Sequence, residues 1–122
     1  MLAAIENKKT VLVVDDQPKV LKFVEIDLKL RGFIVLTTIS GETAVKLVKD
    51  KKPDIVLLDM VMPGMDGVEV LKALRKFTDL PIIAFSASPG NQDLAIQAGA
   101  TDFINKPFDP DHMARTIKSL TK

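Results

Sequence analysis

Five short apolar runs recur along this chain of 122 residues, and a segment with helical periodicity follows each of them. The runs begin near residues 11, 33, 55, 82 and 102. Short apolar runs without polar alternation are typical of strands that are buried on both faces, as in parallel sheets. The sequence therefore predicts an α/β domain in which five parallel strands alternate with helices that cover both faces of the sheet.

The boundaries of the expected elements follow from turn residues and from apolar spacing. We expect strands at Thr10–Val14, Phe33–Leu36, Ile55–Leu58, Ile82–Phe85 and Asp102–Ile104. We expect helices that begin at Pro18, at Ser40-Gly41, at the cap Asp66, near Asp93 and at Asp109-Pro110. In the first helix, two stripes at helical spacing predict one wide apolar face, made by Leu21, Val24 and Leu28 and by Phe23, Ile26 and Leu30.

Composition indicates a single globular domain and excludes several classes of protein. With 47% hydrophobic and 27% charged residues, we expect one domain over residues 10–122 and an N-terminal extension over residues 1–9. The net charge of +1 favours neither nucleic acid nor a membrane as a partner. No apolar run approaches the ~20 residues of a membrane-spanning helix. The absence of cysteine excludes disulfides and thiolate chemistry, and we expect a cytoplasmic protein.

Polar side chains stand where the expected strands end. Asp15 and Asp16 follow the first strand, Asp59 the third and Ser86 the fourth, and Lys106 comes shortly after the fifth. Ligands of open parallel sheets bind outside the carboxyl ends of the strands, where the strand order reverses. If the first and third strands are neighbours, three carboxylates meet at this edge of the sheet.

Three neighbouring carboxylates need a compensating charge. Two carboxylates about 4 Å apart repel each other by roughly 4 kcal/mol at an effective dielectric constant near 20. Three such pairs cost on the order of 10 kcal/mol, which one lysine does not offset. A divalent cation does, and an all-oxygen set of ligands suits Mg²⁺. A hydroxyl and an ammonium group beside Mg²⁺ and a carboxylate form a set of groups that handles phosphate.

Each of these residues also has a purely structural interpretation when it is taken alone. Asp16 can be the N-cap of the first helix, Ser86 an ordinary loop residue and Lys106 a solvated side chain. His112 is interpreted as a surface residue rather than a ligand or a base. The joint placement of several such groups at strand ends, in this order, is what favours a site.

The motifs around these residues make the chain similar to a known family. They are Val14-Asp15-Asp16, Leu58-Asp59 through Asp66-Gly67, Ser86-Ala87, Gln97 to Ala100 with Asp102-Phe103, and Asn105-Lys106-Pro107-Phe108. From Thr10 to Leu120 the sequence resembles the response-regulator receiver domain, the CheY-like module of two-component signalling. The resemblance implies a flavodoxin-like, doubly wound (βα)5 fold whose five parallel strands have the order 2-1-3-4-5.

The resemblance also implies a role for each residue at the strand ends. Asp59 would accept a phosphoryl group from a sensor histidine kinase or a phosphotransfer protein, with Mg²⁺ (or Mn²⁺) as the cofactor. The implied metal ligands are Asp15, Asp16, Asp59 and the backbone carbonyl of Val61. The implied phosphoryl contacts are Ser86, the backbone of Ala87, and Lys106. Ser86, which would swing in toward the phosphoryl group, and Phe103 would form the switch, and the Lys106–Pro107 peptide bond would be cis.

Some details depart from the common pattern of the family. Phe103 has no hydroxyl where many members carry tyrosine. The segment after Ser86 is shorter than in the chemotaxis relative and contains Ser88-Pro89-Gly90, so we expect a short or shifted fourth helix. Val61 and Ser88 offer no strong general base for an attacking water, so we expect slow self-dephosphorylation.

We therefore interpret the chain as a phosphoacceptor signalling module rather than an enzyme; at most it catalyses its own phosphorylation and dephosphorylation. An output protein, or an effector domain outside this sequence, would read the modified state, and the chain would be a monomer or a weak dimer through the fourth helix, fifth strand and fifth helix. Three alternatives remain open: an α/β phosphatase with Asp59 as turnover nucleophile, a flavin or nucleotide carrier, and a degenerate receiver scaffold. Val61 stands where one type of phosphatase would carry a second acid, and Asp15-Asp16-Gln17-Pro18 would repel a bound phosphate.

Overall fold

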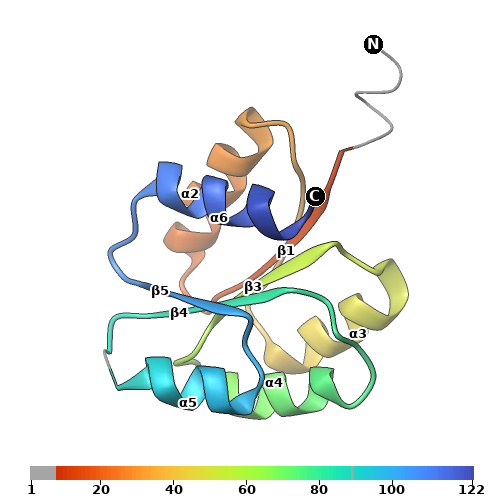
Figure 1. The fold of residues 1–122 in the computed structure, drawn as a ribbon, viewed down its shortest axis with the longest axis vertical. Helices are drawn as coiled ribbons and strands as arrows, with labels where there is room; N and C mark the ends of the chain where they lie inside the picture. The colour runs from red at the N-terminus through yellow and green to blue at the C-terminus, as the bar shows by residue number, and fades with distance from the viewer. Residues whose placement is uncertain (1–7, 89) are drawn as a thin grey trace.

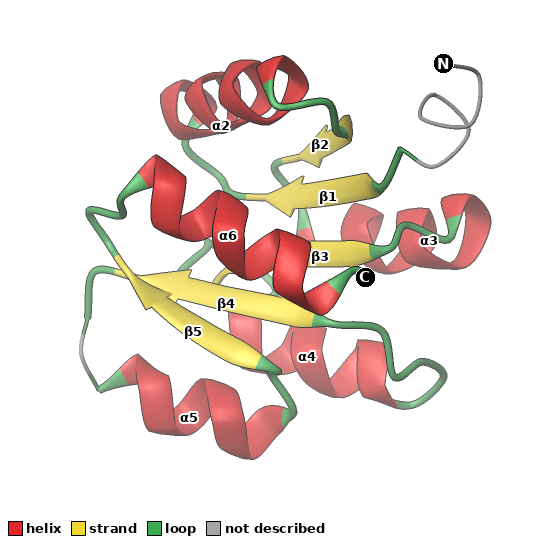
Figure 2. Ribbon diagram, turned by 45° about the horizontal axis from the view of Figure 1, so that its top comes forward, coloured by secondary structure: helices red, strands yellow, loops and turns green. Residues whose placement is uncertain are grey.

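The structure is a computed structural model that describes residues 8–88 and 90–122. A parallel sheet of five strands lies between two layers of helices (Figures 1 and 2). The predicted extension over residues 1–9 lies outside the described residues except for Lys8 and Lys9. Within the described part of the chain, no helix is both long and apolar enough to cross a membrane.

Parallel pairing joins the strands in the order β2-β1-β3-β4-β5, which confirms the expected topology. The strands are β1 (Thr10–Val14), β2 (Ile34–Thr38), β3 (Ile55–Asp59), β4 (Ile82–Ser86) and β5 (Asp102–Asn105). The helices are α2 (Pro18–Leu30), α3 (Gly41–Lys51), α4 (Gly67–Arg75), α5 (Asn91–Ala98) and α6 (Pro110–Leu120). The chain leaves β1 for the edge strand β2 and then crosses to β3 on the other side of β1. The strand order therefore reverses between β1 and β3, where open α/β sheets bind ligands.

Alternation along the strands divides the core into two halves. Helices α2 and α6 cover one face of the sheet, and α3, α4 and α5 cover the other (Figure 2). On β4, Ile83 and Phe85 belong to the half beneath α2 and α6, whereas Ile82 and Ala84 belong to the other half. All four side chains are fully buried, as expected for a central strand of a parallel sheet.

Several element boundaries differ from the prediction, most clearly those of β2 and α5. β2 begins at Ile34 rather than Phe33, because the backbone N–H of Phe33 donates to the carbonyl of Leu28 at the end of α2. β2 also continues through Thr37 and Thr38, which pair with β1 although their side chains end the apolar pattern. Helix α5 begins at Asn91, two residues before the predicted start near Asp93, and it is short, as expected, with 8 residues.

Only one of the two stripes in the wide apolar face predicted for the first helix is buried. Leu21, Val24 and Leu28 are buried, but Phe23, Ile26 and Leu30 are 51%, 49% and 84% exposed. The reason is geometric, because α2 lies on β1, β2 and α6 and only one narrow stripe of a helix can meet such a support. The second stripe is left at the surface, where the Phe23 ring still lies 6.4 Å from the ring of Phe108.

Candidate functional site

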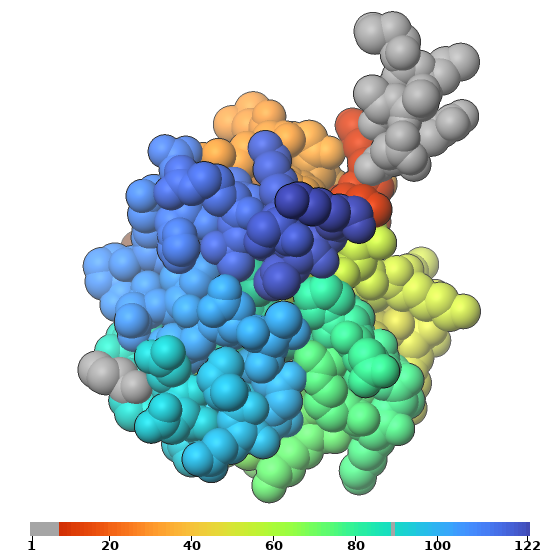
Figure 3. All heavy atoms as spheres, viewed as in Figure 1, coloured from red at the N-terminus to blue at the C-terminus, as the bar shows by residue number. Residues whose placement is uncertain are grey.

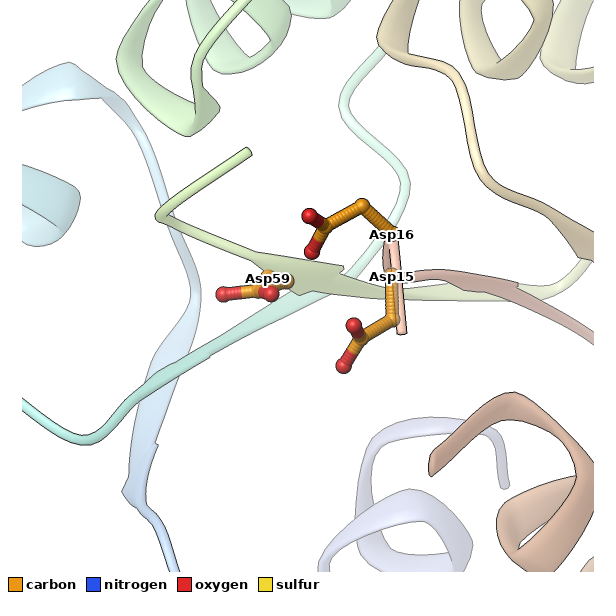
Figure 4. Close-up of side chains that lie close together, drawn as sticks. All are labelled: Asp15, Asp16 and Asp59. Atoms are coloured by element: carbon orange, nitrogen blue, oxygen red, sulfur yellow. The ribbon is translucent and has the colours of Figure 1, made fainter. Parts of the chain in front are cut away.

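Three carboxylates converge at the carboxyl ends of β1 and β3. Asp15 and Asp16 follow the last residue of β1, and Asp59 is the last residue of β3. The two strands pair directly, with Val14 opposite Leu58. One carboxylate oxygen from each of the three acids lies within 4.8 Å of the others (Figure 4). The neighbouring placement on which the predicted acidic cluster depended is therefore present.

Lys106 bridges two of these acids. Its Nζ lies 3.1 Å from Oδ2 of Asp15 and 3.4 Å from Oδ2 of Asp59. Nζ also lies 4.9 Å from the centre of the Phe85 ring, and this cation–π contact helps to position the ammonium group. Asp15 is fully buried and Asp59 is 3% exposed, so this is a desolvated ion pair rather than a surface one. The peptide bond between Lys106 and Pro107 is cis.

Backbone donors hold the second oxygen of each buried acid. Oδ1 of Asp15 accepts a hydrogen bond from the N–H of Gln17 at 2.8 Å, and Oδ1 of Asp59 accepts one from the N–H of Val61 at 3.0 Å. Gln17, not Asp16, occupies the N-cap position of α2. In the described residues, Asp16 has no hydrogen-bond donor or cation as a partner, so its carboxylate is available to a ligand.

The pKa of Asp59 is raised from 3.8 to about 6. Desolvation by burial is the largest cause, and the nearby charge of Asp15 adds to it, whereas the N–H of Val61 and the ammonium of Lys106 lower the pKa. One lysine therefore does not compensate the charge of this site. A further cation would stabilise the ionised carboxylate of Asp59.

Ser86 lines the same cavity as Asp59, but its side chain is hydrogen-bonded to Ser88 and to Asn91 at the start of α5. It is the last residue of β4 and is 1% exposed. Its Oγ accepts hydrogen bonds from Nδ2 of Asn91 at 2.9 Å and from the N–H of Ser88 at 3.1 Å. Its carbonyl accepts the backbone N–H of Lys106 at 2.9 Å. Sequence analysis missed Asn91, because a polar residue five positions later, across a loop, carries no periodic or motif signal.

A cavity of about 330 Å³ is lined by most of the predicted site residues. Another cavity, of about 380 Å³ between α3 and the end of α4, is lined by none of them. The first cavity is lined by Gln17, Asp59, Val61, Ser86, Ala87, Ser88 and Lys106. Phe103 does not line it: this half-buried side chain packs on the core half beneath α3, α4 and α5. The exposed side chain of His112, as expected, lies on α6 away from the site.

The donor set fits a hard divalent cation. It consists of oxygen ligands alone, and the single ammonium group of Lys106 pairs with only two of the three carboxylates. Mg²⁺ binds through one or two carboxylates and several waters, and it prefers such ligands over nitrogen or sulfur. Asp16 supplies an unpaired carboxylate in the described residues, and Val61 lines the cavity together with Asp59. The acidic pocket could therefore bind a metal ion.

Comparison with known proteins identifies the class of protein that has this fold and this acidic pocket. Residues 11–118 match the model of the response regulator receiver domain, and the chain belongs to this family. It is 36% identical over 114 residues to the transcriptional regulatory protein KdpE of Mycobacterium tuberculosis, covering 92% of this chain and 50% of that protein. The chain thus spans about half the length of the curated relatives it matches.

Solved structures show the same similarity. The chemotaxis protein CheY4 of Vibrio cholerae is 31% identical with a TM-score of 0.83, covering 93% of this chain and 98% of that one. The receiver domain of the Francisella response regulator 1452 is 30% identical with a TM-score of 0.88, covering 93% and 97%. Receiver domains are signalling modules of two-component systems that interact with histidine kinases and output domains, so the chain has a phosphoacceptor signalling role.

Proposed function

We propose that Asp59 accepts the phosphoryl group, that residues 10–122 form the domain that presents it, and that the donor is a phosphohistidine of a sensor kinase or a phosphotransfer protein. An oxygen of the Asp59 carboxylate attacks phosphorus, and a P–O bond forms while the P–N bond to imidazole breaks. The electron pair of that bond returns to the imidazole nitrogen. The product is an acyl phosphate. Its formation converts the Asp59 carboxylate, whose pKa burial raises to about 6, into an acyl group bonded to phosphate.

The groups around Asp59 each have a separate task in this proposal. Asp15, Asp16, Asp59 and the carbonyl of Val61 would hold Mg²⁺, which neutralises charge on the phosphoryl oxygens when it is bound. Lys106 would leave Oδ2 of Asp59 and pair with one phosphoryl oxygen. The Ser86 hydroxyl and the backbone of Ala87 would donate hydrogen bonds to the others.

One observation carries the proposal more than any other. Lys106 bridges the two buried acids Asp15 and Asp59 at the wall of a cavity of about 330 Å³. A purely structural ion pair needs no such cavity beside it, and it would not leave a third carboxylate, Asp16, without a partner in the described residues. The geometry supports a group that enters the cavity, takes the place of the carboxylate as partner of Lys106, and brings its own negative charge.

The response to phosphorylation would pass through the other face of the sheet. The phosphoryl group adds about two negative charges and new acceptor oxygens beside Ser86. Phe103, on β5, shares with Ser86 the sheet face beneath α5. Helices α5 and α6 with β5 form one continuous surface (Figure 3). Helix α5 also carries the apolar side chains Leu94 and Ile96, which are 52% and 46% exposed. We propose this surface as the place where an output protein, an effector domain, or a second copy in a weak dimer would bind.

The phosphoryl group should be lost slowly. Val61 is a hydrocarbon side chain two residues after Asp59, and it takes no proton from a water molecule. Ser88, exposed on the opposite wall of the cavity, is a weak base. The same two residues disfavour a turnover phosphatase, because such an enzyme needs a base for the second half of its reaction.

Intact-mass measurement tests the proposed function. The chain is incubated with Mg²⁺ and a small phosphodonor such as acetyl phosphate, and we expect the mass to increase by one phosphoryl group. Asp59→Asn should abolish the increase, because an amide oxygen does not attack phosphorus under these conditions. Asp66→Asn is the matched control: Asp66 is an exposed acid in the loop beyond Asp59, and asparagine preserves its role as N-cap of α4.

Three results would contradict the proposal. They are the absence of a mass increase in the wild-type chain, an increase that persists in Asp59→Asn, and an increase that does not depend on Mg²⁺. Release of inorganic phosphate in many cycles from an aryl phosphate, lost in Asp59→Asn, would instead identify a phosphatase.

A further inference from the structure

Ser86 and Asp59 end neighbouring strands, yet their side chains lie on different faces of the sheet. Ser86 has the same parity as Ala84, which belongs to the core half beneath α3, α4 and α5. Asp59 has the same parity as Leu57, which belongs to the half beneath α2 and α6. Strand geometry therefore directs the hydroxyl toward α5 and the carboxylate toward Lys106.

Two donors hold the Ser86 hydroxyl on the α5 side. Its Oγ accepts from Nδ2 of Asn91 at 2.9 Å and from the N–H of Ser88 at 3.1 Å. A hydroxyl oxygen has two lone pairs, both of which are used here, and one O–H that it can donate. Asn91 is the first residue of α5, so its amide ties the end of β4 directly to the first turn of that helix.

A phosphoryl group on Asp59 would compete for this hydroxyl. Its oxygens only accept hydrogen bonds, so Ser86 can serve them only as a donor. To reach them, Oγ has to turn from α5 toward the end of β3, and this rotation moves it away from Nδ2 of Asn91. The two hydrogen bonds of Ser86, to Asn91 and to the phosphoryl group, then belong to two different arrangements.

We propose, building on the function proposed for Asp59, that Asn91 is a positioning residue that holds Ser86 in the unmodified arrangement. Phosphorylation releases the amide, and with it the first turn of α5. In this way Asn91 opposes the active arrangement and couples the state of the site to the position of α5. Nothing but the side-chain amide is needed for this role, because the backbone N–H of Asn91 donates separately to the carbonyl of Ser88.

The test is a titration of the full chain with beryllofluoride, a phosphoryl analogue, at saturating Mg²⁺, followed by NMR of the backbone amides. Asn91→Ala, and Asn91→Leu, which keeps the branched shape without the amide, should bind the analogue about two- to tenfold more tightly than wild type, the factor that corresponds to one net side-chain hydrogen bond. Without analogue, the resonances of Ser86 and of the first turn of α5 should move part of the way toward their positions in the bound state. Gln92→Ala removes an exposed amide from the same turn and should behave as wild type.

Asn91→Asp gives the opposite sign. Its carboxylate accepts a hydrogen bond from the Ser86 hydroxyl, holds the hydroxyl on the α5 side more firmly and should weaken binding of the analogue. Equal or weaker binding by both Asn91→Ala and Asn91→Leu overturns the proposed role of Asn91. Failure of the wild-type chain to bind beryllofluoride in an Asp59-dependent way contradicts the proposed function itself, and the role of Asn91 with it. Mg²⁺ affinity without analogue should be the same in all variants, which separates this role from damage to the acidic pocket.

Discussion

The two faces of the sheet carry different parts of the same site. On the face beneath α2 and α6 lie the buried acids Asp15 and Asp59, bridged by Lys106 over the ring of Phe85. On the face beneath α5 lie Ser86, bonded to Asn91, and the half-buried ring of Phe103. At this end of the sheet the first face carries buried charged groups, whereas the second carries neutral groups whose contacts are individually weak.

This difference shows how the group that reacts, Asp59, can be separated in space from the group that responds, Ser86. Side chains alternate along β3 and β4, so Asp59, which reacts, and Ser86, which responds, lie on opposite faces of the sheet although they end neighbouring strands. One hydrogen bond from the N–H of Lys106 to the carbonyl of Ser86, at 2.9 Å, links the two sides. A change of charge at Asp59 on one face can then shift the equilibrium between two arrangements of Ser86 on the other face.

The largest difference between the faces should appear when their aromatic rings are removed. Phe85 is fully buried and packs edge-on to Phe108 at 6.1 Å, so Phe85→Ala should lower the free energy of unfolding by about 3–5 kcal/mol. Phe103 is half-buried, and Phe103→Ala should cost about 1–2 kcal/mol. Urea unfolding followed by far-UV circular dichroism measures both values. Equal losses in the two variants would show that the faces are not packed differently.

A smaller effect, of opposite sign, is expected from the charge of Asp59. In the presence of EDTA at pH 7.5, Asp59→Asn should raise the free energy of unfolding by about 1–3 kcal/mol, because it removes a buried carboxylate whose pKa is raised from 3.8 to about 6. The folded chain holds the proton of Asp59 more tightly than the unfolded chain. The stability of wild type therefore falls as pH rises from about 4 through about 6, and Asp59→Asn lacks this fall.

Thermal unfolding in EDTA at pH 4.5 and pH 7.5 checks this prediction. The groups around Asp59 are the acids Asp15 and Asp16 and the cation Lys106. Asp66→Asn, which changes an exposed acid and keeps Asp59, should show the same dependence on pH as wild type. A variant Asp59→Asn that is less stable than wild type at pH 7.5 would mean that the ion pair with Lys106 outweighs the cost of burial.

The smallest effect on stability should come from the neutral face. Ser86→Ala leaves Nδ2 of Asn91 and the N–H of Ser88 without their acceptor and should cost about 1 kcal/mol. Phosphoryl uptake from acetyl phosphate should continue, while the accompanying shifts of α5 amide resonances should be strongly reduced. Ser88→Ala, which keeps the backbone donor, is the control. Full α5 shifts in Ser86→Ala would show that the response does not pass through the hydroxyl.

Local pattern was sufficient for the elements of this fold. The apolar run Ile55–Leu58 and the cap Asp66 identified β3 and the start of α4, because burial on both faces and an unpaired first turn each leave a signal within a few residues. The apolar pattern did not show that the stripe of Phe23, Ile26 and Leu30 is exposed, because the width of a helix face that is buried depends on what lies beneath the helix. No periodicity within α2 contains that information.

The candidate site divides in the same way. The position of Asp15, Asp16, Asp59 and Ser86 at strand ends was readable from the chain, and so was the need for a cation beside three acids. The partner of each side chain was not, because Lys106 reaches Asp15 across 91 residues of sequence. Asn91 was invisible for a related reason: its contact with Ser86 depends on the path of the loop before α5 and on the parity of β4.

By itself, then, the sequence determined the order of strands and helices, the acids that meet at one edge of the sheet, and the chemistry that such a cluster favours. These follow from short-range periodicity and from the charge of each side chain. Only the tertiary structure decided which two carboxylates pair with Lys106, how far burial raises the pKa of Asp59, and that Ser86 accepts a hydrogen bond from Asn91. These depend on distances and desolvation between segments remote in the chain, and packing alone sets them.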